Sequence, residues 1–89
     1  MVEQEVEIIN KLGLHARAAA KLVSTAAAYA SSVKLEFAGN TADAKSIMSV
    51  MMLAAAQGSV IRVQCDGKDE QEAMGAIIGL IDDYFGEDG

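Results

Sequence analysis

The feature that most constrains the fold is the spacing of apolar residues, which switches repeatedly along the chain. Residues 2–8, 33–37 and 59–66 alternate apolar and polar side chains, the pattern of strands that bury one face. A turn signal at Gly39–Asn40 predicts a hairpin that is completed by a short strand over residues 41–44. Together these segments predict four short strands.

Three other segments carry apolar residues at the spacing of an amphipathic helix. The first covers residues 16 to about 30, the second lies within residues 46–58, and the third runs to about Phe85. Asp69 and Glu72 stand in capping-box register and mark the start of the third helix. The predicted buried stripes are Ala19, Leu22, Val23, Ala26, Ala27 and Ala30 on the first helix, and Met74, Ile77, Ile78, Ile81 and Phe85 on the third.

The element order predicted in this way is β-α-β-β-α-β-α. Strands with one apolar face need helices on that face only, and the opposite face can stay in contact with water. We therefore expect an α+β fold, a two-layer open-faced sandwich in which three helices cover one face of a four-stranded antiparallel sheet. The 89 residues suffice for one small domain, which we expect to span residues 1–89.

Charge and composition argue against several classes of function. The net charge is −6, which disfavours binding to nucleic acid, because that affinity depends on neutralising phosphates with Lys and Arg. No segment approaches the ~18 apolar residues of a membrane span, and the N-terminus lacks a basic region before an apolar one. The one cysteine cannot form an internal disulfide. We expect a cytoplasmic monomer that does not insert into membranes.

The stretch NKLGLHARAAAKLV, residues 10–23, places the only histidine directly before an alanine-rich helix. If His15 is the N-cap, the backbone N–H groups of Ala16, Arg17 and Ala18 lack intrahelical partners and form an anion site at the positive helix end. Arg17 opposes the helix dipole, which makes sense if its guanidinium binds an incoming anion. Arg17 and the helix end should also keep the imidazole neutral and nucleophilic near pH 7.

The residues alone leave three hypotheses open for His15: covalent attachment to the anion, noncovalent binding of it, or a surface position without a role. Metal binding is disfavoured, because one histidine and the inward-facing Cys65 do not supply the ligands that zinc needs. The stretch GLHAR has too few glycines for a phosphate-binding loop. We expect neither a metal nor a cofactor.

A second notable stretch is AKSIMSVMMLAAAQG, residues 44–58. Ser46 suits the N-cap of a short helix. The residues that follow are apolar all round: Ile47, Met48, Val50, Met51, Met52 and Leu53. A short helix in a two-layer fold cannot bury them all, which favours an exposed, methionine-bearing docking patch over a deeply buried helix.

These segments together resemble the HPr family, the histidine-containing phosphocarriers of the bacterial phosphoenolpyruvate-dependent phosphotransferase system, and the nitrogen-branch paralogue NPr. The resemblance rests on the two stretches quoted above and on DGKDEQEAMGAI at the last helix, and it spans essentially the whole chain. Ala18 departs from the pattern, since the family most often has proline there. Alanine keeps this position helical and restores one N–H donor.

The resemblance implies a phosphoryl carrier rather than a free-standing enzyme. His15 would accept a phosphoryl group on Nδ1 from enzyme I, which is charged by phosphoenolpyruvate, and pass it to enzyme IIA components. Arg17 would assist the phosphate, and Ser46 would match the serine modified by HPr kinase/phosphorylase. Partner docking would involve Leu14, Ile47, Met48 and Met51. The alternatives are a nitrogen-branch carrier with a mainly regulatory role and a noncovalent anion-sensing domain.

Overall fold

The structure, a computed structural model, describes residues 1–88 and confirms the predicted order of elements. The strands are β1 (Val2–Glu7), β2 (Ser32–Phe37), β3 (Asn40–Asp43) and β4 (Val60–Asp66). The helices are α1 (Ala16–Ala27), α2 (Ile47–Met52) and α3 (Glu70–Asp82), followed by the short 3₁₀ turn η1 (Tyr84–Gly86). Within residues 1–88, no helix has the length and apolar character needed to cross a membrane.

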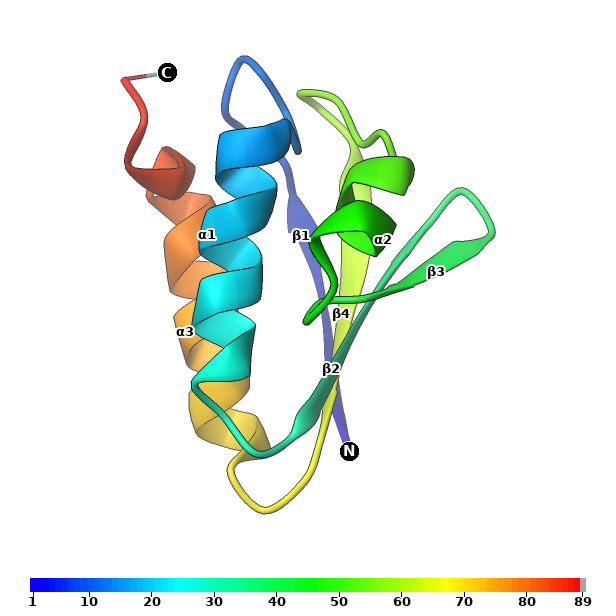
Figure 1. The fold of residues 1–89 in the computed structure, drawn as a ribbon, viewed down its shortest axis with the longest axis vertical. Helices are drawn as coiled ribbons and strands as arrows, with labels where there is room; N and C mark the ends of the chain where they lie inside the picture. Colours follow the sequence, from blue (N-terminus) through cyan, green and yellow to red (C-terminus); the bar gives the residue numbers. More distant parts are fainter. Residues whose placement is uncertain (89) are drawn as a thin grey trace.

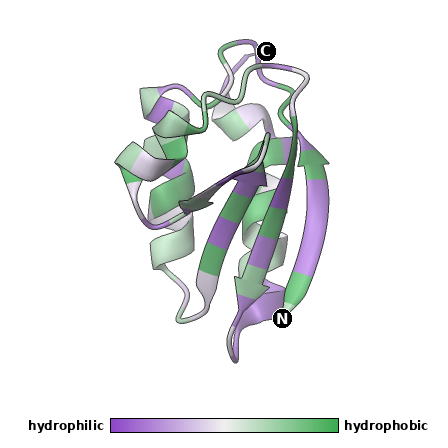
Figure 2. Ribbon diagram, turned by 90° about the vertical axis from the view of Figure 1, so that its right-hand side faces the viewer, coloured by the Kyte–Doolittle hydropathy of each residue, from purple (hydrophilic) through white to green (hydrophobic). Residues whose placement is uncertain are grey.

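The four strands form one antiparallel sheet in the order β1-β4-β2-β3. Register places inward residues of neighbouring strands level with one another, as in the pairs Val6–Ile61 and Leu35–Val63. The helices lie on one face, with α1 and α3 side by side (Figure 1). The alternation of apolar and polar residues along the strands is visible as colour bands in Figure 2. The predicted two-layer open-faced α+β sandwich is confirmed.

The core lies between the sheet and the helices and is built mainly from aliphatic side chains and alanines. Ala18, Ala19, Leu22 and Ala26 are the buried residues of α1. Three of these are alanines, so this helix can pack close to its neighbours without large side chains. Phe85, which follows α3, is fully buried and closes the core next to the end of that helix.

Two local predictions are wrong by a few residues. The first helix ends at Ala27, so Ala30 lies beyond it, and both residues are exposed. The hairpin turn lies at Ala38–Gly39, one residue earlier than predicted. Both residues have positive φ, 53° and 82°, as a two-residue turn of this hand requires.

The capping box predicted for Asp69 and Glu72 is also wrong. Helix α3 does begin after Asp69, but the Asp69 side chain makes no hydrogen bond to the helix end. Its carboxylate instead accepts the backbone N–H groups of Ala30 and Ser31, at 2.8 and 2.9 Å, and the Ser31 hydroxyl. A loop that lies far away in the sequence therefore takes the carboxylate that the local pattern assigned to the helix.

Helix α3 ends at Asp82, which differs from the predicted continuous helix through Phe85. Tyr84 and Phe85 adopt left-handed backbone conformations, with φ of 58° and 54°. Phe85 is buried in the core, as its place in the predicted stripe required, although it lies in the turn η1 and not in α3. Residues 86–88 lie at the end of the molecule where α1 begins (Figure 1).

Candidate functional site

His15 is the N-cap residue of α1, with extended backbone angles of φ −75° and ψ 176°. Its carbonyl accepts the N–H of Ala19 at 2.8 Å, whereas its imidazole makes no capping hydrogen bond. The side chain is 26% exposed. The main chain of His15 is therefore fixed by the helix, and its ring is available to groups outside the helix.

The loop before His15 is fixed by a close backbone approach at Gly13. This residue has φ +65°, and a Cβ there would lie 2.6 Å from the carbonyl oxygen of Ala55. The next residue, Leu14, donates its N–H to the same oxygen at 3.0 Å. Glycine is thus required at position 13, and the docked loop determines where α1 and its histidine begin.

The N-terminal end of α1 presents unpaired backbone donors, as predicted. Within residues 1–88, the first backbone hydrogen bond of the helix comes from Ala19, so the N–H groups of Ala16, Arg17 and Ala18 have no backbone acceptor. Ala16 and Arg17 are exposed, whereas Ala18 is buried. Two of the three positions therefore open toward solvent at the positive end of the helix dipole.

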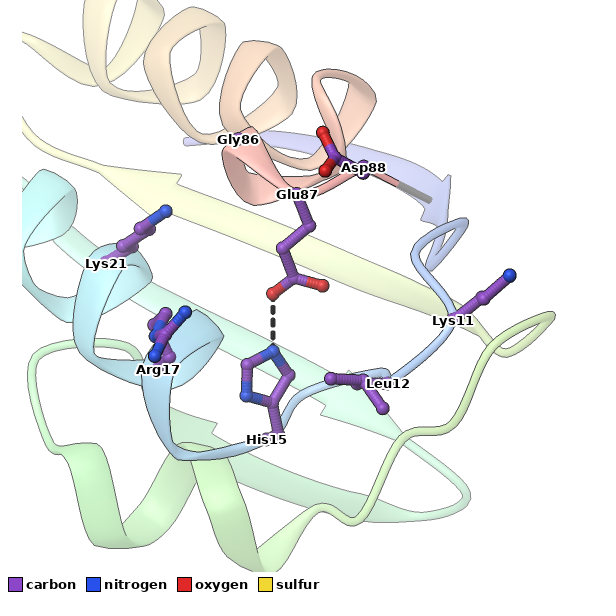
Figure 3. Close-up of a pocket in the computed structure, with 8 residues that line it drawn as sticks. All are labelled: Lys11, Leu12, His15, Arg17, Lys21, Gly86, Glu87 and Asp88. Carbon is purple, nitrogen blue, oxygen red and sulfur yellow. Dashed lines mark hydrogen bonds and ion pairs between the residues drawn. The ribbon is translucent and has the colours of Figure 1, made fainter.

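A groove of about 530 Å³ lies over this helix end (Figure 3). The residues that line it are Lys11, Leu12, His15, Arg17, Lys21, Gly86, Glu87 and Asp88. Arg17 takes part in none of the ion pairs found among residues 1–88. The structure therefore brings together His15, an unpaired guanidinium and free N–H groups, which suits the reversible binding of a small anion.

Glu87 is a residue of this site that the sequence analysis missed. Its Oε2 pairs with Nε2 of His15, and its Oε1 accepts the Nδ2–H of Asn10 at 3.1 Å. The hydrogen bond from His15 holds the pKa of the Glu87 carboxyl below its usual value, and the one from Asn10 acts in the same direction. The ring of His15 therefore faces a carboxylate in addition to the positive groups predicted around it.

The exposed patch predicted around α2 is confirmed. Ile47, Met48, Met51 and Met52 are exposed, Met48 by 70%, whereas Val50 and Leu53 are buried. The alternative prediction, that α2 is deeply buried, is therefore wrong. The Oγ of Ser46 accepts the N–H of Ser49 at 3.4 Å, so Ser46 is the N-cap as predicted.

The prediction that Leu14 docks partners is wrong, because this side chain is only 5% exposed and belongs to the core. The exposed leucine of the same loop is Leu12, at 70%. Gly13 separates the two residues and directs them to opposite sides. Cys65 is buried on the inner face of β4, where burial is the main cause that raises its pKa, so it is a core residue as predicted.

Comparison with known proteins gives consistent results over the whole chain. A family model described as "PTS HPr component phosphorylation site" matches residues 2–83. Phosphocarrier protein HPr of Cupriavidus necator is 55% identical over 98% of both chains. A crystal structure of HPr from Thermoanaerobacter tengcongensis is 44% identical, with a TM-score of 0.96 over 100% of both chains. A second structure from that organism, described as an HPr dimer, is 45% identical and has a TM-score of 0.79 over 98% of this chain and 100% of that one.

Proposed function

The chain belongs to the HPr family of phosphocarriers of the phosphotransferase system, and on this premise we propose that His15 carries the phosphoryl group. Phosphorylated enzyme I would be the donor and an enzyme IIA component the acceptor. What most supports this role is the placement of the only histidine, beside unpaired N–H groups and an unpaired guanidinium in an open groove.

Each transfer exchanges one bond to phosphorus for another. The lone pair of Nδ1 of His15 forms an N–P bond while the bond between phosphorus and its donor atom breaks, and that electron pair stays with the donor. The reverse exchange delivers the group to the acceptor. The guanidinium of Arg17 and the exposed backbone N–H groups of Ala16 and Arg17 would face the phosphoryl oxygens and stabilise their charge throughout.

The electrostatic contacts at this site have a suitable strength for a carrier. Contacts at an exposed helix end contribute about 0.3–1 kcal/mol each, and up to about 2 kcal/mol when partly buried. Arg17 is exposed and is the only guanidinium that lines the groove. The group is therefore held firmly enough to be accepted yet weakly enough to be released.

Docking of donor and acceptor would use the exposed side chains of α2 beside the groove. Ile47, Met48 and Met51 offer flexible apolar contacts that can adapt to partners of different shape. We further propose that the carrier works as a cytoplasmic monomer, so that one surface can meet the two partners in turn. A monomeric mass in solution, by light scattering, tests this against the dimer described for a relative.

Regulation at Ser46 is a second proposal. Ser46 is half-buried, the hydrogen bond that its Oγ accepts from Ser49 N is long at 3.4 Å, and the exposed Ile47 and Met48 follow it directly. A phosphate there would suit the start of α2 but would add about −2 charge beside an apolar docking surface. Modification of Ser46 by a serine kinase would thus weaken docking of enzyme I without unfolding the chain.

The decisive experiment is incubation with enzyme I and phosphoenolpyruvate. The chain should gain one phosphoryl group that is acid-labile and base-stable, and His15→Ala should gain none. Arg17→Ala is the matched variant, because it should still be phosphorylated, but more slowly. A wild-type chain that binds phosphate yet acquires no covalent group would instead support the noncovalent anion-sensing alternative.

A further inference from the structure

We propose that Glu87 is a positioning residue for phosphoryl transfer, because it holds the Nε2–H of His15 and leaves Nδ1 as the nitrogen that attacks phosphorus. This inference rests on the proposed role of His15 and names a further residue that serves it. Glu87 comes from the C-terminal tail, 72 residues along the chain from His15. In Figure 3 its carboxylate points down to the ring, whereas Asp88 points away from it.

The tail that carries Glu87 is anchored at several points. Phe85 is fully buried, and its carbonyl oxygen accepts the Nζ–H of Lys21 at 2.6 Å. Tyr84 and Phe85 hold left-handed backbone angles that side chains seldom adopt, which persist only where the surrounding packing imposes them. The course of the tail across the groove is therefore built into the fold.

The carboxylate is oriented through both of its oxygens. Asn10 is fully buried, and its Nδ2 donates to the carbonyl of Gly13 at 2.9 Å and to Oε1 of Glu87 at 3.1 Å. The other oxygen, Oε2, is left for the ring of His15. A buried amide thus orients a carboxylate, which in turn orients an imidazole, an arrangement that fixes the plane of the ring.

The charge state of Glu87 selects the nitrogen that reacts. An ionised carboxylate only accepts hydrogen bonds, so in the neutral imidazole that faces it the proton lies on Nε2 and the lone pair on Nδ1. Figure 3 shows the second ring nitrogen on the side of the ring that faces Arg17 and the first turn of α1. The nucleophilic atom is thereby directed at the same place as the phosphate-binding donors.

Glu87 also compensates the charge that the transfer creates. When Nδ1 bonds to phosphorus and Nε2 keeps its proton, the ring gains positive charge and no proton has to leave. The carboxylate faces this charge directly and becomes its counter-ion. When the N–P bond breaks in the second transfer, the electron pair of that bond returns to Nδ1 and the ring is neutral again.

The test uses Glu87→Leu, which removes the acceptor, and Glu87→Gln, which keeps an acceptor without charge. Asp82→Asn is the control, because it removes an exposed carboxylate at the end of α3 that does not line the groove. Phosphorylation by enzyme I should be about tenfold slower in Glu87→Leu, by analogy with carboxylates that orient metal-bound histidines, whose loss lowers activity by about 10–100-fold. The loss should fall on the maximum rate rather than on KM. Glu87→Gln should lie between wild type and Glu87→Leu, and Asp82→Asn should be close to wild type.

A spectroscopic readout separates positioning from a merely structural role. The wild-type chain should show a slowly exchanging, downfield Nε2–H proton in ¹⁵N-edited NMR, and Glu87→Leu should lose it while keeping the melting temperature within a few degrees. An unchanged Nε2–H signal or a wild-type transfer rate in Glu87→Leu overturns the role of Glu87. The proposed function has its own test, since a wild-type chain that enzyme I leaves unphosphorylated refutes the carrier role whatever the NMR signal shows.

Discussion

Replacing Phe85 by alanine should lower the free energy of unfolding by about 3–5 kcal/mol, the usual loss for a large buried aromatic side chain. Phe85 is fully buried, although it lies outside the regular helix and only two residues from Glu87. At ~0.05–0.15 kcal/mol per residue, a chain of 89 residues has about 4–13 kcal/mol in total. The substitution therefore removes a large share of the stability of the fold.

Thermal unfolding followed by circular dichroism measures this effect directly. A domain of this size loses about 4–8 °C of melting temperature per kcal/mol, so Phe85→Ala should melt at least about 12 °C below wild type. Tyr84→Ala is the matched control, because Tyr84 has the same left-handed backbone but is 40% exposed. A surface substitution of this kind should change stability by no more than about 0.5 kcal/mol.

Phe85→Leu keeps the experiment informative if the alanine variant does not fold. It should lose only about 1 kcal/mol and should weaken the hold of the tail on His15, visible as faster exchange of the Nε2–H proton. Equal losses for Phe85→Ala and Tyr84→Ala would refute the reasoning. Burial of Phe85 would then contribute little to the stability of the core.

Four further predictions concern separate parts of the molecule. Hydrogen bonds from the Ser31 hydroxyl and, second, from the Ala30 N–H lower the pKa of Asp69 from 3.8 to about 2. The ionised carboxylate therefore stabilises the fold above pH 3.8, and this stabilisation is lost as the pH falls through about 2. Asp69→Asn should reduce the dependence of stability on pH in this acid range, as measured by urea unfolding. Gly13→Ala should destabilise the chain by more than ~1 kcal/mol, because its Cβ would meet backbone at 2.6 Å, and calorimetry should show the loss. Arg17→Ala should slow both transfers through His15 in quench-flow assays while the melting temperature stays near wild type. Ser46→Asp should keep the fold yet slow phosphorylation by enzyme I, with Ser46→Ala near wild type, and equal rates at low salt would refute a regulatory serine.

Much of the fold follows from local patterns in the sequence. The alternation in β1, β2 and β4 determines which face each strand buries, because successive side chains point to opposite sides of a sheet. Helical spacing likewise identifies α1 and α3 and most of their buried faces. His15 before an alanine-rich helix predicts the N-cap and its unpaired donors, since these depend only on where the helix begins. Each of these properties is set by neighbours within a few residues.

Other features depend on segments that only the tertiary structure brings together. Asp69 stands in capping-box register, yet the Ala30–Ser31 loop takes its carboxylate. Leu14 and Leu12 are close in sequence, but the docking of Gly13 against Ala55 buries the first and exposes the second. No local pattern contains these partners.

The site divides in the same way. The sequence by itself determined the nucleophile candidate, the cation beside it and the helix end that faces the anion, because all three lie within residues 15–18. The tertiary structure alone decided that Glu87 reaches the ring. That contact needs the burial of Phe85, the left-handed turn after α3 and the buried amide of Asn10, and it joins residues 72 positions apart. Periodic patterns report how an element meets the core, whereas the partner of a single polar side chain depends on how distant segments pack.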